Sequence, residues 1–414
     1  MSSQDVKIKN YISQYGWICV FLISALEFTI DYSKFHFIDK RVFFVIPTCI
    51  CIYELIKCRA HILKKSMCSL FILCLLVLFC SRDFGYILLG FSIVVLSLME
   101  VGDRQFETIR KLCIVIGMIT AIGCIIQAIN PGFFYSIGSI FLNSSWLAQT
   151  KRFAAWGMYA GFTYQTGTSA NLIVFAIISL LSKPADNAKL NKILILVVLY
   201  IGLILTAKRM LLLIALVLPL ICSLCNTKAE NKNIANKLIA LVAVLVVLII
   251  AFSALLPNLS SITVVKRLFY NDSDLGYSSN RVDYYRMAWN LFKGSPVLGI
   301  GWGKFAAITE IGTSVHNVFI QLLCETGMIG FTIFIIAAGH AFFSIFKKAK
   351  EIYVYEEQER CMIVFSLMIQ VYFLLYCFSG NPLYNISSRT IYFFACIIGY
   401  SMVFIEQKQN ALYE

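Results

Sequence analysis

The amino-acid sequence predicts an all-α polytopic membrane protein of about twelve transmembrane helices, in a single integral domain spanning residues 1–414. Composition indicates this class: 59% of the residues are hydrophobic, 14% are charged, and the mean hydropathy is +0.80. A soluble domain has about 45–50% apolar and about 25% charged residues. Because lipid-facing helices need apolar side chains on every side, both departures predict a membrane protein.

The second observation is a series of apolar segments that approach the length of about 17–25 residues needed to cross a bilayer. The first has no small-residue cleavage site and is interpreted as a retained anchor. The seventh and eighth could instead form one hairpin broken at residues 208–209. The predicted spans lie near residues 12–30, 41–57, 66–80, 84–100, 111–129, 157–182, 192–206, 208–225, 237–256, 317–346, 361–379 and 390–406.

The distribution of charge sets the predicted orientation. The net charge of +13 comes from Lys and Arg in short loops between apolar runs, which is the positive-inside pattern and argues against a nucleic-acid partner. Both termini are therefore predicted in the cytoplasm. The large loop at residues 257–316, expected to contain short helices, then faces the opposite side of the membrane. The fifteen cysteines fall mostly in apolar runs, where Cys behaves as a small hydrophobe.

A basic pair, Lys208 and Arg209, interrupts the apolar run 192–225. Each cation near the bilayer centre costs roughly 2.5–3.5 kcal/mol on insertion, so such a pair normally has a partner. One interpretation is an exposed turn with both side chains reaching the headgroups. The other is an anion site for a lipid phosphate, which Arg binds bidentately. The residues leave both open.

A second basic segment ends at Arg152 and leads into residues 157–170, which are rich in Gly, hydroxyl and amide groups and include Tyr164 and Gln165. Polar groups beside aromatic rings suit sugar binding at a helix mouth. The alternative is a small-residue stripe for helix packing, which is common in membranes.

The large loop carries a third group of cations. Apolar residues at 282, 285, 289 and 292 predict an amphipathic helix along the membrane surface, bearing Arg281 and Arg286. Glycines 299, 301 and 303 then predict a flexible turn. This turn is not a nucleotide-binding loop, because no strand precedes it and no Lys-Ser/Thr follows.

His316 is the single histidine at the junction of the large loop with a predicted membrane helix, and Asn317 follows it. Cations in the same compartment would lower the pKa of His316, leaving a neutral imidazole able to accept a proton. No second His, Cys or carboxylate lies near enough in sequence to suggest a metal site.

The order of these segments resembles the O-antigen polymerase and O-antigen ligase superfamily of bacterial membrane enzymes, over roughly residues 150–335 and in the topology throughout. The closest likeness is the stretch 286–330, with Ser295-Pro296-Val297-Leu298-Gly299-Ile300-Gly301 and a His-Asn-x9-Gly-x-x-Gly pattern at 316–330. Residues 206–209 look like a Thr-x-x-Arg helix break, and Arg152 with the run 161–170 looks like the first outer arginine segment. Lys208 departs from the small or hydroxyl residue that members often carry there.

The resemblance implies a metal-independent glycosyltransferase of the GT-C type with no cofactor, in a bacterial inner membrane, with the large loop and the active site facing the periplasm. Its donor and acceptor would be glycans linked to undecaprenyl diphosphate, and a chain-length regulator protein is an expected partner. Arg209 and Arg281 would hold the diphosphate leaving group, assisted by Arg152, Arg286 or Lys208. His316 would activate the acceptor hydroxyl, with Asn317, Tyr164 and Gln165 binding acceptor or sugar.

The leading interpretation is a polymerase that joins lipid-linked repeat units, favoured by the Gly-Ile-Gly turn after residues 295–296. A ligase that transfers the glycan to lipid A core shares the same motifs. A flippase or transporter is the alternative from another class; it predicts repeats between the two halves, which the sequence does not show.

Overall fold

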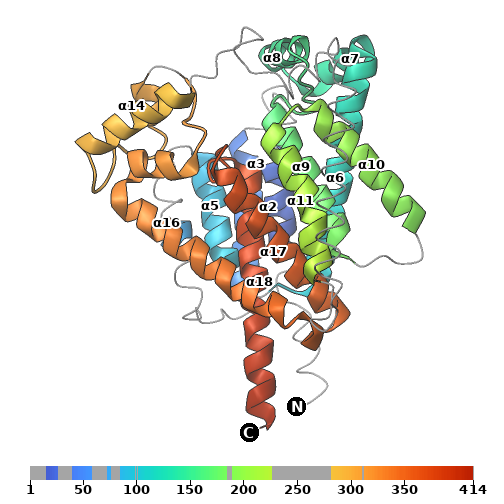
Figure 1. Ribbon diagram of the computed structural model, residues 1–414, viewed down its shortest axis with the longest axis vertical. Coiled ribbons are helices and arrows are strands. Elements are labelled where there is room, and N and C mark those ends of the chain that lie inside the picture. Colours follow the sequence, from blue (N-terminus) through green and yellow to red (C-terminus); the bar gives the residue numbers. More distant parts are fainter. Residues whose placement is uncertain are drawn as a thin grey trace.

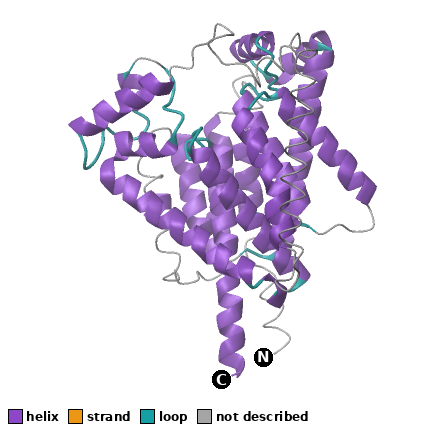
Figure 2. Ribbon diagram, viewed as in Figure 1, coloured by secondary structure: helices purple, strands orange, loops and turns teal. Residues whose placement is uncertain are grey.

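The computed structural model describes residues 15–26, 40–57, 72–75, 84–97, 99, 101–183, 189–225, 281–309 and 312–413. Within these ranges the protein is helical and contains no strand (Figure 2). Three helices are long and apolar enough to cross a membrane: Asp103–Ile129, Val318–Lys350 and Glu357–Cys377. Seven shorter apolar helices accompany them. The protein is thus an all-helical membrane protein, as predicted, while the number of twelve spans stays a prediction.

Most predicted spans coincide with a helix. These are α2 (Gly16–Leu26), α3 (Lys40–Lys57), α5 (Phe84–Ser97), α6 (Asp103–Ile129), α9 (Thr166–Ser182), α10 (Lys189–Leu205), α11 (Arg209–Cys225), α16 (Val318–Lys350), α17 (Glu357–Cys377) and α18 (Ile386–Tyr413). Residues 72–75 are helical within the third predicted span. The ninth, 237–256, lies outside the described residues. The sixth was predicted from residue 157, but its helix begins only at Thr166.

Shorter helices lie between the spans: α7 (Pro131–Phe141), α8 (Ser144–Ala155), α14 (Arg281–Gly294), α15 (Phe305–Ile308) and the 3-10 helix η5 (Ile352–Val354). Figure 1 shows α7, α8 and α14 at one end of the molecule and the C-terminal part of α18 at the other. The two segments predicted to face outward therefore share one end. The large loop itself is described only from residue 281 onward.

Helix α9 forms the centre of the bundle. Fourteen of its 17 residues are buried, and it contacts α6, α10, α11, α17 and α18. Small residues let its neighbours approach closely: a Cβ at Gly117 of α6 would overlap Ala176 of α9, and one at Gly202 of α10 would overlap Ala121 of α6. Such close backbone contact drives helix association in membranes. Because α9 is enclosed, its ends are fixed relative to the other helices.

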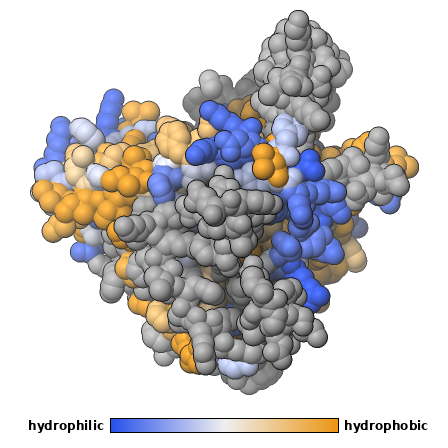
Figure 3. Space-filling view, turned by 90° about the horizontal axis from the view of Figure 1, so that it is seen from below, coloured by the Kyte–Doolittle hydropathy of each residue, from blue (hydrophilic) through white to orange (hydrophobic). Residues whose placement is uncertain are grey.

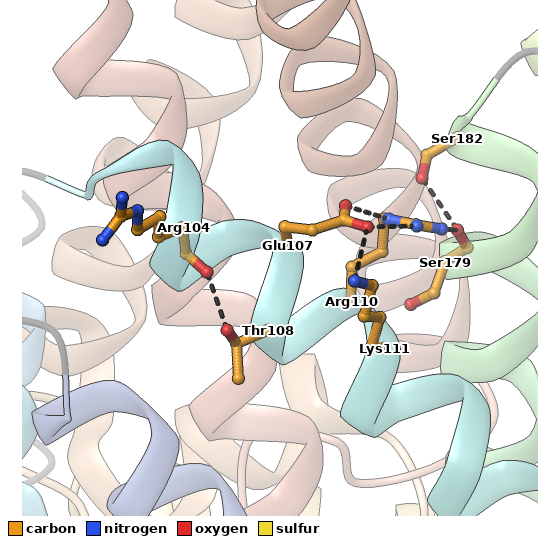
Figure 4. Close-up of polar contacts among 7 residues, drawn as sticks. All are labelled: Arg104, Glu107, Thr108, Arg110, Lys111, Ser179 and Ser182. Atoms are coloured by element: carbon orange, nitrogen blue, oxygen red, sulfur yellow. Dashed lines mark hydrogen bonds and ion pairs between the residues drawn. The ribbon is translucent and has the colours of Figure 1, made fainter.

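The C-terminal end of α9 is tied to α6 by Arg110 (Figure 4). The guanidinium donates from Nε and Nη2 to the two Glu107 carboxylate oxygens, at 2.8 Å each, and from Nη1 to the Ser179 backbone oxygen at 2.9 Å. A cation at the last carbonyl groups of a helix also opposes the negative end of its dipole. This contact fixes α9 at the end opposite α7 and α8.

We predict that Arg110→Met destabilises the bundle by about 1.5–3 kcal/mol, because the charge-assisted bonds to Glu107 are lost and the Ser179 oxygen keeps only the Ser182 hydroxyl as a side-chain donor. Thermal unfolding in detergent measures the change. The matched control is Lys111→Met, since Lys111 lies 3.6 Å from the same carboxylate but its side chain is 68% exposed. An exposed pair contributes about 0–1 kcal/mol. Equal losses of stability in the two variants would contradict the role of Arg110 in fixing α9 to α6.

Candidate functional site

His316 occupies an unusual backbone conformation immediately before α16. Its φ is 61°, in the left-handed region that a residue with a Cβ rarely adopts. Contacts on both sides hold it there: the Val315 amide donates to Gln321 Oε1 at 3.3 Å, and Asn317 caps α16 by accepting from the Ile320 amide at 3.1 Å. Strained residues persist where the surroundings over-determine them, and they cluster at functional sites.

The surroundings of His316 disfavour its charged form. Burial of the imidazole, the Arg281 charge and the Lys208 charge, in that order, lower its pKa to about 4. Thr313 Oγ1 lies 3.3 Å from the imidazole Nε2. His316 is therefore neutral at pH 7, as the sequence predicted, and it lies with two of the predicted cations. These three residues, Lys208, Arg281 and His316, are called the basic cluster.

Lys208 reaches the cluster because the chain breaks between α10 and α11. Ala207 takes a φ of 53°, and α11 begins directly afterwards at Arg209. A Cβ built on Gly167 would lie 3.9 Å from Lys208 Cε and 4.0 Å from the Tyr376 hydroxyl. Arg281 also acts electrostatically on Tyr376. Lys208 and Tyr376, a residue that the sequence analysis missed, thus lie at the first turn of α9, and their electrostatic partners His316 and Arg281 join the cluster to it.

That first turn adds to the positive potential. Gln165, the N-cap of α9, makes no side-chain cap hydrogen bond, so the first amide groups of α9 have no side-chain acceptor from it. Helix amides and the positive dipole end form a favourable environment for an anion. Together with Lys208 and Arg281, this geometry suits a phosphate or diphosphate. Among the described residues, no group of three or more His, Cys, Asp or Glu side chains forms a candidate metal site.

Residues 157–165 bring the predicted sugar-binding segment against this region. Gln127 Oε1 accepts from the amides of Ala160 and Gly161, at 3.0 and 2.9 Å, and the Tyr159 amide donates to the Leu205 oxygen at 2.9 Å. Gly161 has a φ of 57°, and a Cβ there would lie within 2.8 Å of the Thr120 oxygen. The segment is therefore fastened to α6 and to the end of α10.

The other predicted site residues differ in how the structure places them relative to the basic cluster. Tyr164 stacks on Trp146 of α8 with ring centroids 4.2 Å apart, which offers an aromatic platform. Arg152 is exposed in the last turn of α8, and the structure describes no polar contact for it. Arg286 pairs with Asp283 at 3.7 Å, with both side chains largely exposed, so the structure does not bring it into the basic cluster.

Asn317 has both ends of its amide engaged. Besides capping α16, its Nδ2 donates to the Phe378 oxygen at 3.2 Å, at the end of α17. This geometry favours a role in positioning His316. The predicted contact of Asn317 with the acceptor sugar stays untested.

A buried carboxylate that the sequence analysis missed organises the same region. Glu325 of α16 accepts hydrogen bonds from the Gly303 amide at 2.8 Å, the Phe305 amide at 3.1 Å and the Tyr384 hydroxyl at 2.8 Å. Gln321 Nε2 donates to it at 3.3 Å. Gln321 in turn accepts from Val315 and from Asn381, at 2.6 Å. One carboxylate thus joins the glycine turn, the segment before His316 and the segment between α17 and α18.

The glycine turn at residues 299–303 is consequently not the flexible turn that the sequence predicted. Glycines 299, 301 and 303 all have positive φ, and the amides of Ile300 and Gly301 donate to the oxygens of Cys324 and Glu325, at 3.0 and 2.8 Å. These bonds are available because α16 is interrupted at Gly327, whose φ is 64°. A Cβ on Gly327 would overlap the Val297 carbonyl group. The predicted Gly-x-x-Gly pattern therefore marks a helix break packed against the turn.

We predict that Glu325→Gln lowers the thermal unfolding midpoint and exposes residues 299–316 to protease. Each carboxylate oxygen accepts from two donors, so an amide nitrogen at either position would face two of the four donors. A buried unsatisfied group costs about 1–3 kcal/mol. Differential scanning fluorimetry and limited proteolysis in detergent measure both effects. Glu351→Gln, on an exposed side chain at the end of α16, is the control and should change neither. Unchanged melting of the Glu325 variant would refute the organising role.

The fold and this site define a polytopic membrane protein with a basic, phosphate-compatible centre at one end. Residues 194–335 match the family described as O-Antigen ligase. The match supports the O-antigen ligase and polymerase superfamily that the motifs predicted, whose members are glycosyltransferase-like enzymes. The matched segment includes Lys208, Arg281, His316 and Glu325. No curated protein matches the chain significantly.

Proposed function

We propose that the protein is a polymerase of lipid-diphosphate-linked oligosaccharide repeat units in the bacterial inner membrane, with its site facing the periplasm. The observation that carries the proposal is the basic cluster: a neutral imidazole lies with two fixed cations at the N-terminus of a buried helix. A leaving diphosphate needs fixed positive charge, and an attacking hydroxyl needs a proton acceptor. Both requirements meet within one family-matched segment.

The donor binds through its diphosphate. Lys208 and Arg281 contact the phosphate oxygens beside the first turn of α9, and Arg209, the first residue of α11, supplies a third cation. Tyr376 donates a hydrogen bond from its hydroxyl. Arg152 assists from α8, whereas Arg286 takes no part because it faces away with Asp283. Preorganised cations stabilise the negative charge that grows on the leaving oxygen.

The acceptor is the terminal sugar of a second lipid-linked unit. Its hydroxyl oxygen attacks the anomeric carbon of the donor glycan, and the bond from that carbon to the phosphate oxygen breaks. The hydroxyl proton moves to His316, and undecaprenyl diphosphate leaves. Binding of the anionic diphosphate offsets the charges of Lys208 and Arg281, so the pKa of His316 rises as the substrate arrives. The imidazole then becomes a stronger base where it is needed.

Polymerase is preferred to ligase because of the glycine turn after Ser295-Pro296. An assay in reconstituted vesicles distinguishes the two activities. With lipid-linked repeat units as the sole substrate, a polymerase yields a ladder of chain lengths. A ligase yields product only when lipid A core is added. In cells, loss of a polymerase leaves single repeat units, whereas loss of a ligase leaves long chains on the lipid. A chain-length regulator protein is the proposed partner.

We predict that His316→Ala abolishes chain extension while the protein remains folded and inserted. His316→Asn is the sharper variant, because Asn tolerates the left-handed backbone while removing the base. Product ladders on gels measure extension, and thermal unfolding measures folding. A normal ladder from either variant would rule out the role of His316. Product made by wild-type protein only when lipid A core is present, without a ladder of chain lengths, would replace polymerase by ligase.

We predict that the acid limb of kcat/KM against pH lies near pH 4 in the wild type, because free His316 loses activity when it is protonated. The acid limb of kcat should lie higher, since it reports the substrate complex. Lys208→Gln removes one of the causes that lower the pKa, so its kcat/KM limb should move to higher pH. Burial remains, so the limb should stay below the ordinary His value. Identical limbs in both proteins would show that His316 is not the titrating group.

A further inference from the structure

The helix α14 presents a mixed apolar and basic face that the proposed chemistry does not use. Its other face packs into the protein, where Tyr284, Ala288 and Leu291 meet Phe305, Val315 and Cys324. On the outer face, Val282 is 60% exposed and Trp289 46% exposed, with Arg286 and Lys293 also exposed. At 3.6 residues per turn these four share one stripe. They are called the α14 stripe.

The exposed apolar surface continues from α14 onto the turn that follows it. Val297 is 59% and Leu298 71% exposed, so these two aliphatic side chains project from the turn. The turn is fixed to α16 by hydrogen bonds from the amides of Met328 and Ile329 to the oxygens of Pro296 and Val297, at 2.9 and 3.3 Å. Exposed apolar groups of this extent, held rigidly in place, indicate a binding surface.

Lipid is the occupant that this surface fits, because it adjoins the outer side of a membrane-crossing helix. Met328 and Ile329 are each 48% exposed, and the exposed stripe continues down α16 through Ile335, Ile336 and Phe343. Figure 3 shows hydrophobic and hydrophilic side chains side by side along the left edge of the molecule, where α14 and α16 lie. Aromatic and basic residues interleaved on an apolar face are typical of helices that lie in the bilayer interface.

We propose that the α14 stripe and residues 296–298 bind the surface of the bilayer at this end of the molecule. Trp289, Val297 and Leu298 enter the boundary between headgroups and acyl chains, and Arg286 and Lys293 bind anionic lipid phosphates. Arg281 is the first residue of the same helix, so lipid binding holds it at headgroup depth. That this depth suits Arg281 for binding a lipid-linked diphosphate rests on the proposed function. The contact of α14 with lipid does not.

Fluorescence of Trp289 tests the lipid contact without any assay of activity. Wild-type protein and Trp289→Phe are reconstituted into vesicles of phosphatidylethanolamine and phosphatidylglycerol, with and without bromine on the acyl chains. The difference between the two proteins isolates Trp289. We expect brominated lipid to quench this component. A component that is unquenched, with the emission of a water-exposed indole, would overturn the proposal.

Trp302→Phe is the matched control. Trp302 lies on the neighbouring turn but stacks on Tyr384 with centroids 4.3 Å apart, so its component should be quenched less than that of Trp289. Equal quenching of the two would overturn the specific placement. Arg286→Gln combined with Lys293→Gln should weaken the quenching of Trp289 in vesicles containing phosphatidylglycerol and leave it unchanged in phosphatidylcholine vesicles.

A second copy of this chain is the competing occupant of the surface. If the copy covers it, Trp289 escapes quenching and Leu298→Asp lowers the particle mass in detergent; that pair of results overturns lipid binding. If lipid covers it, the mass stays the same and Leu298→Asp weakens the quenching of Trp289. Because neither readout needs substrate, this proposal and the proposed polymerase activity can fail separately.

Discussion

The arrangement of the candidate site depends on one buried carboxylate, that of Glu325. Its oxygens accept from Gln321, one turn earlier on α16, and from two segments that are distant in sequence: residues 303–305 and the segment between α17 and α18. A buried carboxylate is expensive unless hydrogen bonds replace the water it has lost. Each segment is therefore held where its donor can reach the carboxylate. Through Gln321 and Val315, the same network fixes the backbone that precedes His316.

The basic cluster brings charges of like sign near one another. The Lys208 and Arg281 charges both disfavour a charged His316, and burial of the imidazole adds to that cost. Fixed charges that disfavour one another in the free protein become favourable when an anion lies among them. The strained backbone at Ala207 and His316 fits the same pattern, because both residues flank the cluster. Backbone strain and like charges thus occur together where the proposed substrate binds.

The sequence predicted what periodicity and charge can reveal, and it missed what only distant contacts create. The apolar runs predicted most helices, and the spacing at 282–292 predicted α14. Of the apolar positions there, Val282 and Trp289 turned out to face outward, whereas Tyr285 packs into the protein beside Tyr284, Ala288 and Leu291. Glu325 and Tyr376 looked like ordinary helix residues. Their roles depend on partners about 20 to over 200 residues away, such as Gly303 for Glu325 and Gly167 for Tyr376.

The geometry of α14 also explains why its two arginines take different parts. At 3.6 residues per turn, positions 281 and 286 point about 140° apart around the helix axis. A helix packed along Tyr284, Ala288 and Leu291 cannot turn both side chains towards the same phosphate. Arg281 acts on His316 and Tyr376, whereas Arg286 lies on the exposed stripe beside Trp289. Two cations that share one helix and one loop therefore have separate partners: a substrate phosphate for the first and membrane lipid for the second.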